Sequence, residues 1–211
     1  MRHREMRLRS LAWAMHGWAC GVRGRAGPPR GFIRAFDSLY CWYHNLRASE
    51  ADIAPALLVE IRRARKTRML GDGTTIRPGC RIGVLHLNND RVALLHRQDG
   101  GPLAVGLAFK HRLVQSLERL ADLARPDGRL ADVDAYSAIT IFHHGLPRLG
   151  FERDPHRLLL GRMIAAYQRA LLASLHPAGI GRAGLARGTA ERVWLSRARL
   201  LARYGRTARA G

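Results

Sequence analysis

The spacing of hydrophobic positions predicts a fold that combines helices with a small sheet. Apolar side chains recur at helical spacing in four segments: 32–46, 102–125, 156–175 and 197–204. Three shorter segments are expected to be strands: 56–63, 133–142 and VWLSR at 193–197. Residues 56–63 also fit a short helix, and a strand is favoured because β-like sequence follows them directly.

The segment 70–97 predicts a β-meander, in which tight turns join three strands. Turn residues stand at three places in it: Asp72-Gly73, Pro78-Gly79 and Asn88–Asp90. The third strand is expected at residues 92–95. A glycine-rich loop is expected at 176–190. Together the elements predict one α+β domain, with a small mixed or antiparallel sheet flanked by three to four helices.

Charge divides the chain into a central domain and two basic ends. The 211 residues carry a net charge of +20, with seven Arg and one Glu in residues 1–30 and eight Arg and one Glu in residues 181–211. We expect a basic, disordered extension at 1–30, a domain at 31–205 and a basic tail at 206–211. Such ends attract anionic lipid or nucleic acid, or they serve only as solvated tails.

Cysteine usage and hydropathy indicate the compartment. Cys20, Cys41 and Cys80 are odd in number and lack CxxC spacing, which is typical of a reducing compartment. The sequence has no apolar run of about 18 residues, which a spanning helix would need. The N-terminus is a poor match to a secretory signal. We therefore expect a cytoplasmic protein that contacts the inner membrane peripherally through its basic ends.

Three segments resemble a known family. They are LGDGTTIRPGCRIGVLHLNN (70–89), AITIFHHGLPRLGF (138–151) and VWLSRARLLARYG (193–205), and the resemblance covers roughly residues 32–205. The chain resembles the YkoP-like family of bacterial proteins, which occur alone or attached to polysaccharide deacetylases. The resemblance implies a role near cell-envelope carbohydrate or its lipid carriers, by association only. Cys80 stands where relatives often carry an acidic residue.

His86, Asn88 and Asn89 form the first candidate site. On a strand, His86 and Asn88 point to the same face, where imidazole, amide and turn N–H groups could hold a sugar hydroxyl or a phosphate. The alternative is structural. Asn88-Asn89 would then supply a tight turn, and His86 would be a core histidine with a hydrogen-bond partner.

Thr140 and His143 form the second candidate site, at the end of the predicted strand 133–142, and His144 follows them. Strand ends that precede helices often bind ligands, and histidine can act as a base or a metal ligand. The spacing of the histidines matches no zinc motif, so no metal is predicted. No cofactor is assigned.

Arg197 is the third candidate, because it follows Ser196, a good N-cap for the terminal helix. A cation in the first turn opposes the helix dipole. Arg197 is therefore expected either to pair with a carboxylate or to meet a phosphate-bearing ligand.

Three functions remain open on the sequence. The first is a binding or accessory domain for envelope polysaccharide or lipid-phosphate metabolism, with a groove lined by His86, Asn88, Thr140, His143 and Arg197. The second is a transferase or hydrolase with His86 or His143 as general base and a carboxylate beside it. The third is a basic adaptor for an anionic membrane or, ranked lower, for nucleic acid.

Overall fold

The computed structural model describes residues 52–95, 102–175 and 188–205. The predicted helix at 32–46, the extension at 1–30, the tail at 206–211 and most of the glycine-rich loop lie outside these ranges. Within them the α+β prediction is confirmed, because helices pack on a mixed six-stranded sheet.

The six-stranded sheet has the order β1-β2-β5-β6-β8-β7. Its strands are listed here: β1 (Asp52–Ile53), β2 (Leu57–Arg63), β5 (Arg81–Leu87), β6 (Val133–Thr140), β7 (Glu152–Arg153) and β8 (Glu191–Ser196). β5 and β6 pair in parallel, and every other neighbouring pair is antiparallel. A parallel pair needs a crossover connection, which the helices between β5 and β6 provide.

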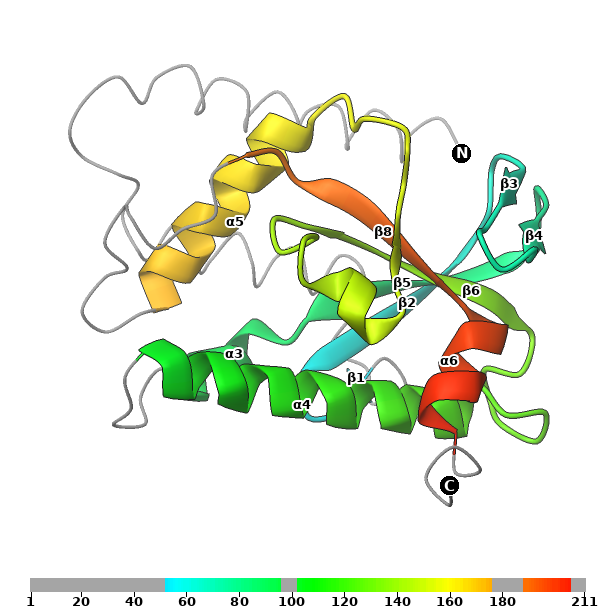
Figure 1. Cartoon of the computed structure of the whole chain (residues 1–211), viewed down its shortest axis with the longest axis horizontal. Coiled ribbons are helices and arrows are strands. Elements are labelled where there is room, and N and C mark those ends of the chain that lie inside the picture. The colour runs from blue at the N-terminus through cyan, green and yellow to red at the C-terminus, as the bar shows by residue number, and fades with distance from the viewer. Residues whose placement is uncertain (1–51, 96–101, 176–187, 206–211) are drawn as a thin grey trace, which may run out of the picture.

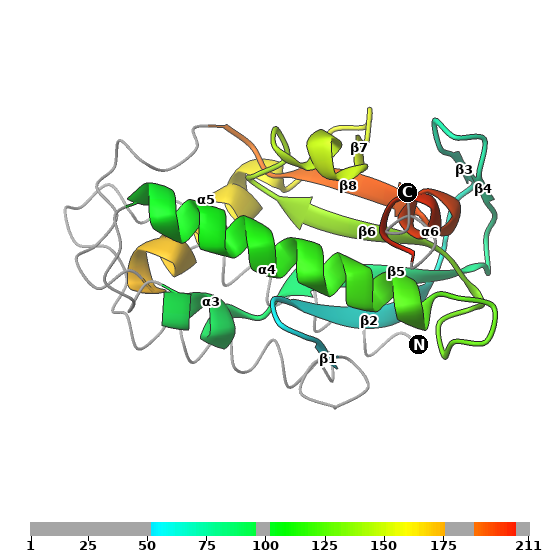
Figure 2. The same ribbon diagram turned by 60° about the horizontal axis from the view of Figure 1, so that its bottom comes forward.

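The main hydrophobic core lies between one face of the sheet and two helices. α4 (Pro102–Leu123) runs across the strands, and α6 (Arg197–Tyr204) packs beside the C-terminal end of α4 (Figure 2). Leu117 of α4 and Leu200 of α6 are fully buried in this core. Side chains alternate between the two faces of a strand. Val193 and Leu195 of β8 therefore enter this core, while Trp194 packs on the other face of the sheet.

The opposite face of the sheet is covered in two places. The hairpin of β3 (Arg68–Met69) and β4 (Thr75–Ile76) places Leu70 and Ile76 against Trp194. α5 (Gly161–Leu175) contributes Ala165 to a smaller cluster at the other end. Figure 1 shows the hairpin and α5 at opposite ends of the molecule.

A close contact crosses the centre of the sheet at Gly83. A Cβ placed on Gly83 would lie 2.5 Å from Tyr136 Cδ1, which is closer than van der Waals contact permits. The Tyr136 ring of β6 therefore packs directly over the Gly83 backbone of β5.

The β-meander prediction was wrong. Two of its three strands form, as β4 and β5, but β4 pairs with β3 while β5 pairs with β2 and β6, so they are not neighbours in one sheet. The turns at Asp72-Gly73 and Pro78-Gly79 form, with φ of 85° at Gly73 and 91° at Gly79. The segment expected as the third strand is instead α3 (Asn89–Leu95). Asn88 Oδ1 accepts a hydrogen bond from Arg91 N at 3.2 Å, so the asparagine begins a helix and does not turn a hairpin.

The other helices and strands predicted within the described ranges are confirmed, with a shorter start to α5. The segment expected as a helix from 156 becomes helical only at Gly161. Leu159, an apolar residue of that segment, is 99% exposed. Asp154 Oδ1 accepts from His156 N at 2.9 Å, and this local turn competes with helix formation there. The short helical turn expected before Leu149 forms as η2 (Leu146–Leu149).

Candidate functional site

The six predicted site residues do not line one pocket. Thr140 is paired with Glu191, and Ala135 with Ser196, so Thr140 and Arg197 lie at opposite ends of the β6–β8 ladder. His86 lies at the end of β5, opposite Leu58 of β2. A single groove that includes both Thr140 and Arg197 is therefore not formed, because the length of β8 separates these two residues.

His86 lies beside a carboxylate. Its Nε2 is 3.4 Å from Glu60 Oε2, and the two side chains are 18% and 17% exposed. Arg62 also contacts Glu60, at 2.7 Å from Nη2 to Oε2. Glu60 and Arg62 lie on β2 and His86 on the adjacent β5, so the sheet register brings an imidazole, a carboxylate and a guanidinium to one face.

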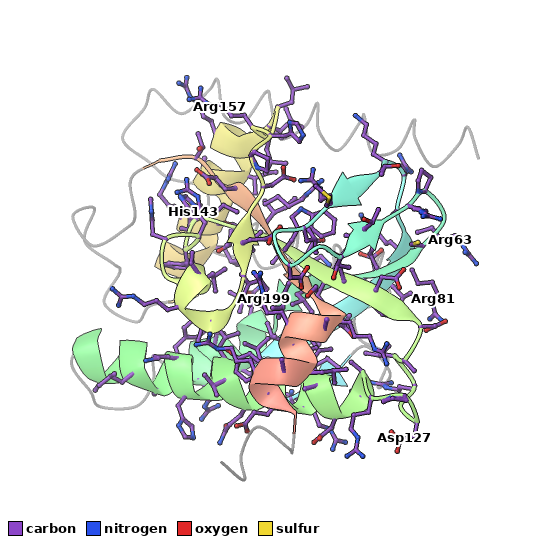
Figure 3. All side chains as sticks on the ribbon, turned by 45° about the vertical axis from the view of Figure 1, so that its right-hand side comes forward. Arg63, Arg81, Asp127, His143, Arg157 and Arg199 are labelled. Carbon is purple, nitrogen blue, oxygen red and sulfur yellow. The ribbon has the colours of Figure 1, made fainter. Side chains whose placement is uncertain are left out.

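His143 forms a second imidazole–carboxylate pair, and it is buried. Nε2 lies 3.4 Å from Glu191 Oε1, and Nδ1 lies 3.3 Å from Thr140 O. Both ring nitrogens therefore face acceptor oxygens. Arg153 holds Glu191 through two bonds of 2.8 Å, and the His144 ring lies 4.2 Å from the His143 ring at an interplanar angle of 43°. In Figure 3 His143 lies on the side of the molecule away from Arg63 and Arg81.

Asn88, Asn89 and Arg197 make structural contacts. Asn88 N donates to Ala56 O at 2.8 Å, its side chain begins α3, and Asn89 is the first residue of that helix. Arg197 Nε donates to Ala124 O at 2.6 Å, a carbonyl partner that was not among those expected for it. Carbonyls just beyond a helix end lack intrahelical donors, and Arg197 supplies one to the end of α4.

The first and last of the three segments that carry the family resemblance meet in one place, together with Glu152, which directly follows the second segment. We call this contact region the motif junction, and it consists of Gly71, Asp72, Glu152, Ser196 and Arg199. Ser196 Oγ donates to Asp72 Oδ2 and accepts from Arg199 N at 2.9 Å. Glu152 Oε2 accepts from Gly71 N at 2.8 Å and lies 3.5 Å from Arg199 Nη1. The junction thus fastens the β3–β4 hairpin to β7 and to the start of α6.

The RLGF segment joins the same region from its other side. Gly150 has a φ of 90°, a conformation that favours glycine, and it ends η2. Arg199 Nη1 lies 3.4 Å from Gly150 O, and Tyr204 Oη donates to Leu149 O at 3.0 Å. The sequence motifs therefore contact each other through backbone and side chain, although long stretches of chain separate them.

Polar contacts within the junction lower the pKa of Asp72. Burial by itself raises it, but hydrogen bonds from Ser196 and Thr74 and the positive charge of Arg199 together hold it below its usual value of 3.8. Ser196 is only 2% exposed, and its hydroxyl both donates and accepts within the junction. Such a hydroxyl is a helix cap and not an accessible nucleophile.

Beyond the junction the β2–β5 pair extends as a basic arm. We define the basic arm by Arg63, Arg65, Lys66 and Arg77, all of which are exposed. Arg63 Nη1 donates to Gly79 O at 2.9 Å, and none of the four forms an ion pair with a described carboxylate. Figure 3 shows Arg63 and Arg81 pointing outward on the hairpin side.

The basic arm was missed in the sequence analysis, although the signal is visible. Residues 62–68 read RRARKTR, with five basic residues in seven positions. Charge density alone could have identified the segment, whereas its lack of acidic partners required the structure.

Neither a membrane span nor a metal cluster is found in the ranges described. No helix there combines the length and hydropathy that a membrane crossing requires. Nor do three or more His, Cys, Asp or Glu side chains of those ranges gather closely enough to hold a metal ion.

Comparison with known proteins gives one match. The family model described as the YkoP domain matches residues 30–204, which is most of the chain. No curated protein and no solved structure matches the chain. All five residues of the motif junction lie inside the matched range.

Proposed function

This chain belongs to the YkoP domain family, and we propose that it is a binding or accessory domain for a phosphate-bearing ligand of cell-envelope polysaccharide or lipid-phosphate metabolism. The observation that carries the proposal is the basic arm. Its four cations are exposed and form no ion pair with a described carboxylate. Exposed guanidinium and ammonium groups that have no carboxylate partner are suited to bind phosphate oxygens.

The surroundings of the arm support a binding role. Between residues 62 and 81 the only acidic residue is Asp72, which is held by Ser196 in the motif junction. The three other basic residues of the segment are already paired, Arg62 with Glu60, Arg68 with Asp154 and Arg81 with Asp132. The remaining cations are thus left for an external anion, and the junction holds the hairpin that presents them.

Removing three cations of the arm should weaken phosphate binding. We expect the triple variant Arg65→Gln, Lys66→Gln, Arg77→Gln to bind inorganic pyrophosphate and farnesyl diphosphate at least about tenfold less tightly. The measurement is isothermal titration calorimetry on the full chain. Tighter binding of farnesyl diphosphate than of pyrophosphate would point to a lipid phosphate as the ligand.

A matched control separates the arm from total charge. The variant Lys110→Gln, Arg119→Gln, Arg162→Gln removes one lysine and two arginines from exposed positions on α4 and α5. Its affinity should stay within about twofold of wild type, because these charges lie far from the arm and are screened by salt. Equal losses in both triple variants would contradict a site at the arm.

A second function is favoured by the His86–Glu60 pair. The sequence analysis required a carboxylate beside a catalytic histidine, and Glu60 lies 3.4 Å from His86 Nε2. His86 is a better candidate base than His143, because the His143 side chain is only 6% exposed. In this alternative, Glu60 orients the imidazole and His86 takes a proton from water or from an acceptor hydroxyl.

The catalytic alternative is tested by replacing His86. If the chain hydrolyses p-nitrophenyl esters or bis(p-nitrophenyl) phosphate, His86→Gln should lower kcat by about a hundredfold or more. His144→Gln, at an exposed histidine, serves as the control. Turnover that survives His86→Gln would exclude His86 as the base.

A further inference from the structure

The basic arm is an extension of the sheet with cations on both of its strands. Arg63 is paired with Arg81, and Arg68 with Ile76, so residues 64–67 run antiparallel to residues 77–80. Two backbone bonds hold this stretch together: Ala64 N to Cys80 O at 2.8 Å and Gly79 N to Ala64 O at 2.9 Å. Arg65 and Lys66 therefore lie across from Arg77, and β3 and β4 form the end that projects in Figure 1.

An exposed apolar side chain lies at the end of the arm. Met69 is 77% exposed, although its neighbour Leu70 is buried at 3%. Methionine is flexible and apolar, and it enters disordered hydrophobic surroundings at low cost. An exposed methionine beside exposed cations is the combination that interfacial segments use, with the cations on headgroups and the apolar group below them.

The hairpin is held so that this end stays exposed. Arg68 lies 5.2 Å over the Trp194 ring and pairs with Asp154 at 2.9 Å, while Trp194 Nε1 donates to the same carboxylate at 3.2 Å. On the other side of the hairpin, Gly71 N is bonded to Glu152. These contacts leave Met69 and the arm cations directed away from the core.

We propose that the basic arm docks this protein onto an anionic lipid surface, with Arg63, Arg65, Lys66 and Arg77 on the headgroup phosphates and Met69 inserted between the headgroups. This rests on the proposed function and names the occupant of its site. Nucleic acid also carries phosphates, but single-stranded recognition uses exposed aromatic rings as stacking surfaces. Trp194, the aromatic ring that packs against the hairpin, is 6% exposed and lies beneath Arg68.

Vesicle flotation of the full chain tests the proposal. We expect it to float with vesicles of mixed phosphatidylcholine and phosphatidylglycerol but not with phosphatidylcholine alone, and the binding should weaken as salt is raised. The variant Arg65→Gln, Lys66→Gln, Arg77→Gln should lose on the order of a hundredfold in affinity, since each basic residue near such a surface contributes about a fivefold factor. The control variant Lys110→Gln, Arg119→Gln, Arg162→Gln should lose less than about fivefold.

Met69 distinguishes docking on a bilayer from simple attraction to phosphate. Met69→Asn should weaken vesicle binding by about fivefold and leave pyrophosphate binding unchanged, because only the bilayer offers an apolar layer. Leu107→Asn replaces another exposed apolar residue, 58% exposed on α4, and should change neither. A Met69→Asn variant that binds vesicles as wild type does would overturn the insertion.

Other outcomes separate this inference from the proposed function. Residues 1–30 are present in every variant. Vesicle binding that survives loss of the arm cations would therefore come from another part of the chain, and it would overturn the inference. Arm-dependent binding of pyrophosphate without vesicle binding would leave the proposed function standing and reject the membrane. Arm-dependent binding of duplex DNA in place of vesicles would also reject it. Failure to bind any of these probes would reject both.

Discussion

Replacing Leu117 by alanine is expected to lower the free energy of unfolding by about 3 kcal/mol. Leu117 is fully buried in the core between α4 and the sheet, together with Leu120 and Tyr136. The substitution removes apolar surface that folding takes out of water and leaves a cavity that the rigid strands cannot fill. Urea denaturation followed by circular dichroism measures the change.

Leu107→Ala provides the control for this substitution. It makes the same chemical change on the same helix, but Leu107 is 58% exposed. We expect less than about 0.5 kcal/mol of destabilisation, as is usual at exposed positions. Equal effects at Leu107 and Leu117 would mean that α4 does not use the face described here to cover the sheet.

Asp72→Asn is expected to destabilise the protein by about 1 kcal/mol at neutral pH, because the carboxylate accepts hydrogen bonds from Ser196 and Thr74. This loss of folding free energy is smaller than is usual for hydrogen bonds to a charged acceptor, because Asp72 is exposed and water screens its charge. Asp127→Asn, at a side chain that is 78% exposed, should change stability by less than about 0.5 kcal/mol.

The stability difference between wild type and Asp72→Asn should depend on pH in a defined direction. Because the folded-state pKa of Asp72 is lowered, the carboxylate stabilises the folded protein above its ordinary pKa of 3.8. That stabilisation should disappear as the pH falls through the lowered pKa. Denaturation curves of both proteins over acidic pH measure this, and a constant difference would show that ionisation of Asp72 is not linked to folding.

A double-mutant cycle tests the contact on which the junction depends. Ser196→Ala removes both the N-cap of α6 and the donor to Asp72, so it should cost about 1 to 2 kcal/mol. Combined with Asp72→Asn, the two losses should fall short of additivity by about 1 kcal/mol. Strict additivity would mean that the two side chains do not interact.

The junction gives the family motifs a structural meaning that bears on function. Its residues satisfy one another and position the hairpin, whereas the exposed cations lie next to it on the arm. Under the proposed function, weakening the junction should reduce ligand affinity indirectly by loosening the hairpin. The phosphate and vesicle titrations of Ser196→Ala can be compared directly with those of the arm variants.

Most elements could be predicted from the sequence because their signals are local. The apolar spacing of 102–125 predicts α4, and the β-branched run of 133–142 predicts β6. The turns at Gly73 and Gly79 follow from residues that accept positive φ. The error at 89–95 is local too, since asparagine favours both hairpin turns and helix N-caps, and the short apolar run after it fits either element.

Side-chain partners required the tertiary structure. Asp72 and Ser196 are 124 positions apart, and Glu191 of β8 reaches His143, which lies in the turn after β6. Arg197 donates to the carbonyl of Ala124 at the end of α4, a contact that its place in the sequence does not predict. No spacing rule relates such residues, because strand order and helix packing bring them together.

The sequence by itself thus determined the class of fold, most of its elements, the basic character of the chain and the family. The tertiary structure alone decided which charges are neutralised. Arg68 and Arg81 meet carboxylates brought from other segments, while Arg65, Lys66 and Arg77 meet none among the described residues. The physical reason is that an ion pair acts over a few ångströms, and only the folded chain fixes which charges lie that close.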